Sequence, residues 1–275
     1  MFECINFDEY LAEFVSEWMT DHSSEYKNFD AMEADMPNIY VRFLNKPASW
    51  LQGLTPGAFF TQYEDPKDLV DWLKKYTDEG VPVPELLCEQ IENVGKPCEK
   101  RLVALLKDEE ANADAKMTAI SILRNLDSTQ PKMLYISWQL NRSEDDELAE
   151  NGLESLSAMG RSAVQPMLEA LPKANDAGQI ALLDVLCRYP GNEQVYSTCM
   201  RLFQEKPEKK AILASYLGRL QDERALPVLM DACLKEDLNY LDYLELRSAI
   251  EELGGTAPER DYTGDPAYEA LEGIH

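Results

Sequence analysis

The sequence predicts an all-α protein, a right-handed α-solenoid of about six helical hairpins with a helical cap at its N-terminal end. Three observations indicate this fold. Helix-sized segments recur about every 31 residues from Pro97 onward, and residues 1–63 do not follow this repeat although they hold 13 of the 25 aromatic residues. Inside the segments, apolar residues repeat with helical spacing. A hairpin of this size cannot bury its apolar stripe alone, so neighbouring hairpins must stack.

Residues 1–63 are expected to form the cap. Their first helix carries one apolar stripe, made of Phe7, Tyr10, Leu11, Phe14 and Trp18, and acids expected on its other side, Asp8, Glu9, Glu13 and Glu17. Residues 1–36 hold ten acids against the single base Lys27. Two interpretations stay open: a cap over the end of the array, or an aromatic and acidic surface that docks Lys or Arg side chains. The loop 46–57 contains helix-breaking Pro and Gly and marks a boundary.

The repeat proper is predicted over residues 64–255. Its first helices begin 33, 31, 31 and 31 residues apart, near Pro97, Gln130, Arg161, Asn192 and Glu223. Second helices open about one period apart, near Asp114, Asp146, Asp176, Glu208 and Asn239. Residues 68–76 and 84–94 form an earlier hairpin that extends the array. This alternation is the helix–turn–helix rhythm of a solenoid.

Residues at the predicted helix ends agree with these bounds. Prolines stand at or near the starts of first helices, where a missing N–H costs little: Pro97, Pro131, Pro166 and Pro227. Acids stand where second helices begin and suit the helix dipole: Asp114, Asp146 and Asp176. Glycines are expected directly after second helices: Gly160, Gly191 and Gly254.

Two segments resemble a known repeat family. Residues 210–234 read KAILASYLGRLQDERALPVLMDACL, and residues 153–171 read LESLSAMGRSAVQPMLEAL. Both are similar to HEAT-like repeats of the PBS-lyase type, in which an A-x-x-L-G end is followed by a short turn and an Ala-Val/Leu-x-Pro start. The matching positions are Leu217, Gly218, Asp222, Arg224, Ala225, Leu226, Pro227 and Leu229, and Met159, Gly160, Ala163, Val164, Pro166, Met167 and Leu168. The resemblance covers about residues 97–255 and implies a fold rather than a function.

Activities known in that family can be compared with the residues present. The resemblance implies relatives among bilin lyases, a di-iron hydroxylase, DNA glycosylases and scaffolds. The hydroxylase needs several His-Glu pairs as iron ligands, whereas this chain has only His22 and His275, neither followed by Glu. The glycosylases need a basic surface for the DNA backbone, and this chain is acidic. The hydroxylase activity is therefore excluded, and DNA glycosylase activity is not expected.

The charge of the chain restricts its partners. Acidic residues number 51 against 26 basic ones, so the net charge is −25. Such a field repels phosphate and anionic lipid and favours basic partners, so nucleic acid and membrane are not expected as partners. The alternative is that the charge serves solubility alone. Residues 1–10 lack a basic segment followed by an apolar one, and no apolar stretch has membrane-spanning length, so a cytoplasmic protein is expected.

Residues that carry chemistry are sparse. The six cysteines are scattered without CxxC pairs, so we expect core residues rather than a disulfide framework or a zinc site. Neither histidine stands where it would serve a Ser or Cys nucleophile, and phosphate-binding glycine motifs are absent. The acidic run 144–147 is interpreted as a helix N-terminus rather than a cation site. No catalytic residue, metal site or cofactor is predicted.

The predicted partner-binding surface is the one lined by second helices. Asp184 and Ser215 are 31 residues apart, as are Arg188 and Arg219, so the repeat should stack them in rows. Tyr243 and Arg247 lie at nearly the next position. These residues form either a solvated face or a polar groove that binds a peptide or a partner helix.

Residues 256–275 form an acidic extension, either docked or frayed, whose only candidate anchors are Tyr262, Tyr268 and Leu271. The function that the sequence favours is a non-catalytic protein-binding or scaffold protein with an acidic helical surface for a basic protein or peptide. The alternative is an enzyme or small-molecule-binding member of the HEAT-like family with a pocket that the sequence does not reveal. The oligomeric state stays open.

Overall fold

The computed structural model describes residues 3–272. Within them the chain forms helices joined by turns and contains no β-strand, which confirms the predicted all-α class. The chain divides into two compact units, Met1–Pro131 and Lys132–His275. This division falls inside residues 64–255, the segment that the sequence assigns to one uninterrupted array. His275 itself lies outside the described residues.

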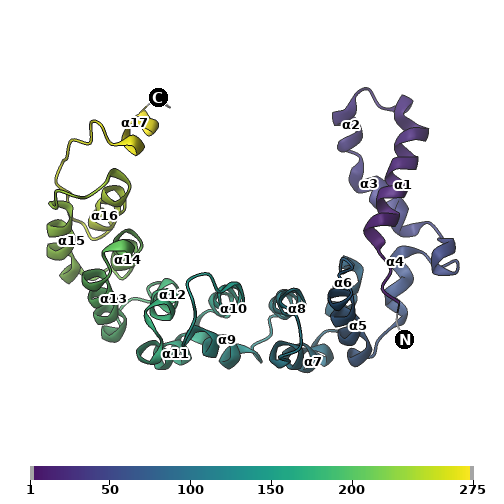
Figure 1. Ribbon diagram of the computed structural model, residues 1–275, viewed down its shortest axis with the longest axis horizontal. Coiled ribbons are helices and arrows are strands. Elements are labelled where there is room, and N and C mark those ends of the chain that lie inside the picture. Colours follow the sequence, from purple (N-terminus) through teal and green to yellow (C-terminus); the bar gives the residue numbers. More distant parts are fainter. Residues whose placement is uncertain (1–2, 273–275) are drawn as a thin grey trace. The chain divides into compact units, whose positions relative to one another are not determined.

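The first unit holds eight α-helices among its described residues (Figure 1). They are α1 (Phe7–His22), α2 (Phe29–Glu33), α3 (Met36–Asn45), α4 (Pro56–Phe59), α5 (Pro66–Asp78), α6 (Glu85–Val94), α7 (Lys96–Lys107) and α8 (Ala113–Asn125). Short 3₁₀ turns cover Ser23–Glu25, Ser49–Leu51 and Phe60–Gln62. The loop 46–57, expected to break helix, thus contains one such turn and the start of α4.

Helix starts in this unit have a local cause. Asn6, Asp65 and Asn112 each accept a hydrogen bond from a backbone N–H in the first turn of α1, α5 and α8. Such side chains satisfy donors that the helix itself leaves unpaired. Pro66 follows directly at the first position of α5, where its ring fits. The predicted hairpin of residues 68–76 and 84–94 is therefore present as α5 and α6.

An aromatic cluster joins the segment before α5 to α5 itself. Phe60 and Tyr63 have ring centres 5.0 Å and 5.1 Å from that of Trp72, and Phe7 lies 5.4 Å from Phe60. The indole N–H of Trp72 donates to the carbonyl of Glu3 at 3.1 Å. Trp72 is almost fully buried. The excess of aromatic residues before residue 64 therefore builds the core that holds this segment on α5.

The second unit holds the remaining α-helices among the described residues. They are α9 (Lys132–Gln139), α10 (Glu147–Ala158), α11 (Arg161–Ala170), α12 (Asp176–Leu186), α13 (Glu193–Glu205), α14 (Lys210–Arg219), α15 (Leu226–Cys233), α16 (Tyr240–Glu252) and α17 (Pro266–Glu272). Short 3₁₀ turns cover Leu171–Lys173, Pro207–Lys209 and Glu223–Ala225. First and second helices alternate from α9 to α16 as the spacing predicts.

Helices α10, α12, α14 and α16 line one side of this unit, and α9, α11, α13 and α15 line the other (Figure 1). Each even-numbered helix packs on the next, from α10 to α12, α14 and α16. Their inward residues are almost fully buried, among them Leu156, Leu182, Leu213 and Leu246. Burial of about one such side chain per turn supplies most of the stability of each helix.

The predicted helix ends are correct in part. Gly160 and Gly254 follow helix ends at φ 59° and 78°, the left-handed conformation that glycine tolerates. Gly191 does not: it lies five residues beyond the end of α12, in a loop. Pro166 was expected near a helix start but lies inside α11. It provides no N–H for the carbonyl of Ser162, and Lys132 Nζ donates to that carbonyl instead, at 2.9 Å.

Side chains one period apart connect neighbouring hairpins inside each unit. The sequence separations are 33, 31, 31 and 31 residues in the pairs Asn125–Glu92, Gln130–Glu99, Arg188–Ser157 and Arg224–Glu193. These separations equal the spacing between first helices that the sequence predicts, so the side chains in each pair hold equivalent positions in that spacing.

A buried polar junction joins α9 to α10 and α12. Gln139 is fully buried, donates from Nε2 to the carbonyl of Ala149 at 2.8 Å, and accepts from Arg142 Nη1 at 2.9 Å. Arg142 also pairs with Glu150 at 2.8 Å. A Cβ on Gly178 would lie 1.8 Å from the carbonyl oxygen of Gln139. Glycine at this position in α12 therefore allows the two backbones to meet.

The segment after α16 is docked on its own unit. Tyr262 is 8% exposed and has ring centres 5.2 Å and 5.1 Å away in Tyr240 and Tyr243. Arg260 Nη1 donates to the carbonyl of Cys233 at 2.8 Å, and Asp265 Oδ2 accepts from the backbone N–H of Tyr240 at 3.1 Å. Of the two expectations for this extension, docking holds for the described residues.

Candidate functional site

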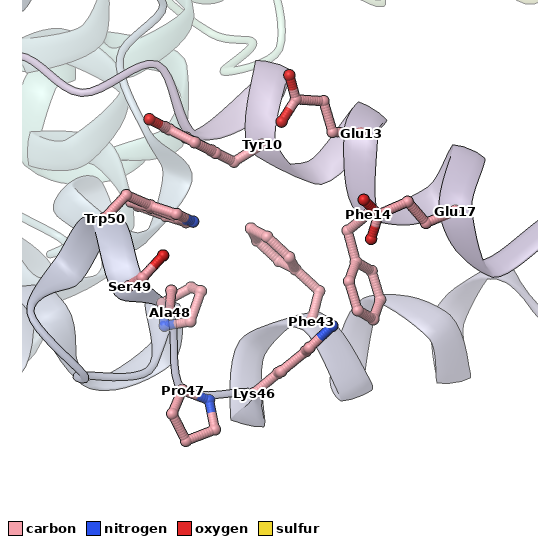
Figure 2. Close-up of a pocket in the computed structure, with 11 residues that line it drawn as sticks. Tyr10, Glu13, Phe14, Glu17, Phe43, Lys46, Pro47, Ala48, Ser49 and Trp50 are labelled. Atoms are coloured by element: carbon pink, nitrogen blue, oxygen red, sulfur yellow. The ribbon is translucent and has the colours of Figure 1, made fainter.

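A groove lies in the first unit between α1, α3 and the 46–57 loop (Figure 2). We call it the aromatic groove, and its volume is about 280 Å³. Its lining includes four aromatic side chains, two carboxylates and one ammonium group: Tyr10, Phe14, Phe43, Trp50, Glu13, Glu17 and Lys46. It therefore combines apolar faces with charge of both signs in a space that fits one side chain.

The rings of the groove come in two pairs. Tyr10 stacks face to face on Trp50, with ring centres 3.9 Å apart and an angle of 8° between the planes. Phe14 and Phe43 meet at 5.7 Å and 51°. Phe43 is buried, whereas the other three rings are half-exposed. Half-exposed rings present faces whose negative electrostatic potential attracts cations.

The carboxylates of Glu13 and Glu17 border the same groove as the rings of Tyr10 and Phe14. The sequence placed these acids on the opposite side of the first helix, and that assignment is wrong. At 100° per residue, positions 10, 13, 14 and 17 share one face of a helix. Within the described residues, neither carboxylate forms an ion pair. Both side chains are exposed.

Two cations from the region of α3 contact rings of α1. Lys46 Nζ lies 5.0 Å from the ring centre of Phe14, and the guanidinium of Arg42 lies 4.6 Å from that of Trp18. Both distances are typical of cation–π contacts. Figure 2 shows the Lys46 side chain directed towards Phe14 within the groove. The exposed face of α1 thus already binds cations, supplied by its own chain.

Four of the six residues predicted to bind a partner are brought together in the second unit. Asp184 on α12 accepts from Arg188 at 2.9 Å and from Arg219 on α14 at 3.2 Å. Arg219 also donates to Ser215 at 3.3 Å, and its guanidinium lies over the ring of Tyr216. These groups form one network across two neighbouring even-numbered helices, and they satisfy one another.

Tyr243 and Arg247 do not join this network. Tyr243 is 6% exposed, and its hydroxyl donates to the carbonyl of Pro258 at 3.1 Å. It is therefore covered by the segment after α16. Arg247 pairs with Glu251 one turn along its own helix, at 2.7 Å. Sequence spacing places both residues on α16 correctly but does not reveal the docked segment that covers Tyr243.

A second groove lies between α10, α12 and α14, with a volume of about 280 Å³. Its lining includes the apolar side chains of Leu153, Ile180 and Ile212 and the carboxylate of Asp184. Its two cations, Arg142 and Lys209, are paired with Glu150 and Glu144. Glu144, at the start of the acidic run 144–147, thus has a structural partner, and Asp146 caps α10 by accepting from Ala149 N–H.

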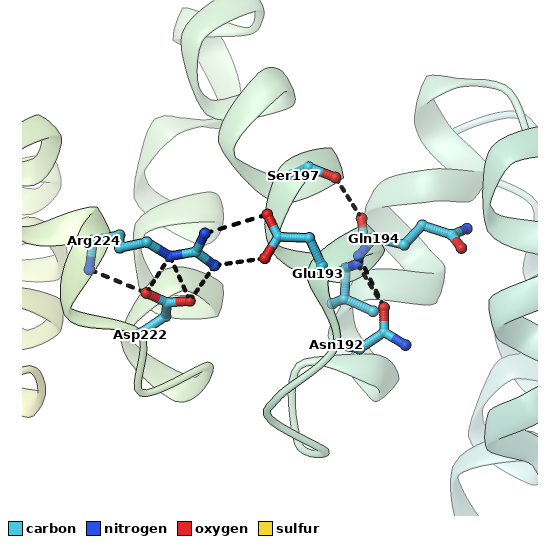
Figure 3. A network of polar contacts seen from close by, with 7 residues as sticks. Asn192, Glu193, Gln194, Ser197, Asp222 and Arg224 are labelled. Atoms are coloured by element: carbon cyan, nitrogen blue, oxygen red, sulfur yellow. Dashed lines mark hydrogen bonds and ion pairs between the residues drawn. The ribbon is translucent and has the colours of Figure 1, made fainter.

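A polar network joins α13 to the 3₁₀ turn that precedes α15 (Figure 3). Arg224 Nη2 lies 2.7 Å from both Glu193 on α13 and Asp222, and its guanidinium is 4.2 Å from the ring centre of Tyr196. The hydrogen bond from Arg224 lowers the pKa of Asp222, and the two acids raise the pKa of Arg224. Every charge here has a partner, so the network is a connection between hairpins.

Two of the cysteine thiols have raised pKa values, and His22 is stacked on an aromatic ring. All six cysteines are free, and burial raises the pKa of Cys98 to about 11 and of Cys88 to about 12. Such thiols stay protonated at neutral pH. The ring of His22 stacks on Trp18 with ring centres 3.6 Å apart. Among residues 3–272, no cluster of three or more His, Cys, Asp or Glu side chains is suited to a metal ion.

Sequence reasoning missed two residues of the aromatic groove, Lys46 and Trp50, which come from the 46–57 loop. The available signal was an aromatic residue inside a Pro- and Gly-containing loop, where exposure would be costly without a packing partner.

None of the described helices is long and apolar enough to span a membrane. No protein-family model, curated protein or solved structure matches the chain.

Proposed function

We propose that this is a non-catalytic binding protein of the cytosol that takes a Lys- or Arg-bearing segment of a protein partner into the aromatic groove. The observation that carries the proposal is the pair of carboxylates, Glu13 and Glu17, which lack an ion-pair partner among the described residues and stand beside aromatic faces. Opposite charge and a ring face both attract a cation.

The distribution of charge supports the same conclusion. Residues 1–36 carry a net charge of −9, against −25 for the whole chain. A negative field of this kind speeds the approach of basic proteins and repels nucleic acids. The packing of α10, α12, α14 and α16 along one side of the second unit supports our further proposal that its hairpins are HEAT-like solenoid repeats.

The test is titration of a peptide of alternating Lys and Ser residues, with a Glu-for-Lys peptide as the negative control. The variant Glu13→Gln with Glu17→Gln is expected to weaken binding about twofold to thirtyfold, because each exposed charge pair contributes roughly 0.2–1 kcal/mol. Glu9→Gln with Asp21→Asn is the matched control, since both acids are on α1 but do not line the groove. Equal loss in the two double variants, or no binding to the Lys peptide, would contradict the proposal.

A further inference from the structure

Lys46 stands where a ligand cation would be bound. Its Nζ lies 5.0 Å from the ring centre of Phe14, in the groove that Glu13 and Glu17 also line. The Lys46 side chain is exposed and forms no ion pair within residues 3–272. An exposed cation–π contact is weak, so the side chain can leave the ring at little cost.

We propose that the aromatic groove binds one lysine side chain of the partner, and that Lys46 occupies this position as an internal ligand until the partner displaces it. This inference rests on the proposed function and adds two statements to it: the class of side chain that is bound, and a competitor supplied by the chain itself.

The two cations beside α1 argue for lysine. The ammonium group of Lys46 lies inside the groove, whereas the guanidinium of Arg42 contacts Trp18, which does not line it. An ammonium group is compact and has three donors on a flexible stem. The ammonium group can therefore contact a ring face on one side and a carboxylate on the other. The planar guanidinium needs a wider approach.

An internal ligand lowers the apparent affinity for an external one. The competitor is tethered to the site, so its occupancy does not depend on protein concentration. An exposed cation–π contact such as that of Lys46 with Phe14 gives a roughly twofold to fivefold preference for the state in which Lys46 occupies the groove. Removing it should therefore tighten binding of the partner about threefold to sixfold.

The experiment compares Lys46→Met with Lys46→Arg and Lys27→Met in the full chain. Met keeps the length of the side chain and removes its charge. Lys27→Met makes the same change in net charge at a position that does not line the groove. The probes are the alternating Lys–Ser peptide and its Arg–Ser counterpart, titrated by calorimetry. An independent readout is the proton resonance of the Lys46 side chain next to its nitrogen, which the Phe14 ring shifts upfield in the free protein.

We expect Lys46→Met to bind the Lys peptide about threefold to sixfold more tightly than wild type, with Lys27→Met within about twofold of wild type. Lys46→Arg should lie between Lys46→Met and wild type, because its guanidinium fits the groove less well than an ammonium group. Addition of the peptide should move the Lys46 resonance to its ordinary position. If Lys46→Met gains no more than Lys27→Met while the Glu13 and Glu17 variants still lose affinity, the internal ligand is disproved and the proposed function stands. Equal binding of the Arg peptide would disprove the lysine preference, and binding of neither peptide would disprove the function itself.

Discussion

At the scale of single residues, the polar groups of the second unit differ sharply in what they contribute. Arg142 has a side chain that is 5% exposed and donates to the fully buried Gln139. Arg188 has a side chain that is 50% exposed and pairs with Asp184 in solvent. Water competes with the exposed Arg188–Asp184 ion pair but not with the buried Arg142–Gln139 hydrogen bond. Both contacts measure 2.9 Å, yet the buried one contributes more to the free energy of unfolding.

Replacement of these two arginines tests that difference. Arg142→Met leaves the Oε1 of Gln139 without its donor inside the core, and we expect the free energy of unfolding to fall by about 1–3 kcal/mol. Arg188→Met should stay within about 0.5 kcal/mol of wild type. Urea unfolding followed by circular dichroism measures both. Losses of the same size in the two variants would show that the junction at Gln139 is not sealed from water.

At the scale of elements, the segment after α16 is held by ring contacts of Tyr262 and by hydrogen bonds of Arg260 and Asp265. Among residues 256–271, Tyr262 is the buried side chain, and Asp265 accepts from the backbone N–H of Tyr240. The other residues of 256–271 are exposed or half-exposed, and segments of this kind open locally, at a cost well below global unfolding. Their mobility can therefore be changed without unfolding the helices beneath.

Tyr262→Ala is expected to undock this segment. Removing the ring takes away its contacts with Tyr240 and Tyr243, so amide hydrogen exchange should become faster over residues 256–272 and at Tyr240. Exchange in α5 to α8 should not change. Leu271→Ala is the control, because Leu271 is 44% exposed. Unchanged exchange after Tyr262→Ala would mean that the other contacts of the segment suffice to hold it.

Helix positions could be read from the sequence because their causes are local. Capping by Asp146 and the left-handed φ of Gly160 depend on a few neighbouring residues, and the apolar stripes have a fixed period. The aromatic groove could not be read in full, since Trp50 and Lys46 reach α1 only through tertiary packing. For the same reason the cover over Tyr243 was not foreseen.

At the scale of the whole molecule, negative charge is shared almost equally between the units. Residues 1–131 hold 25 acids against 12 bases, a net charge of −13, and residues 132–275 carry the remaining −12. Like charges within one compact unit repel, and this repulsion lowers the stability of the folded state. Salt screens it, because the Debye length falls from about 30 Å at 0.01 M to about 8 Å at 0.15 M.

Salt should therefore stabilise the fold while it weakens binding of a basic partner. We expect the midpoint of thermal unfolding to rise with ionic strength, by about 2–4 °C for each kcal/mol of repulsion removed. Over the same range, affinity for the Lys–Ser peptide should fall. NaCl and KCl at equal ionic strength should have the same effect. A midpoint that falls as salt is added would show that attractive ion pairs outweigh the net charge.

The hydrogen bonds at the start of the chain set an order of events during synthesis. Ile5 N–H bonds to the hydroxyl of Tyr76, and Trp72 bonds to the carbonyl of Glu3, across 71 and 69 residues. At translation rates of about 5–20 residues per second, residues 3–6 wait roughly 4 to 14 s on the ribosome before these partners have been added. In the second unit, residues joined across one period, such as Ser157 and Arg188, are 31 residues apart. The earlier residue of such a pair therefore waits less than half as long for its partner. Residues 3–6 thus stay without these partners throughout that interval, in which a nascent-chain chaperone would meet the apolar side chain of Ile5.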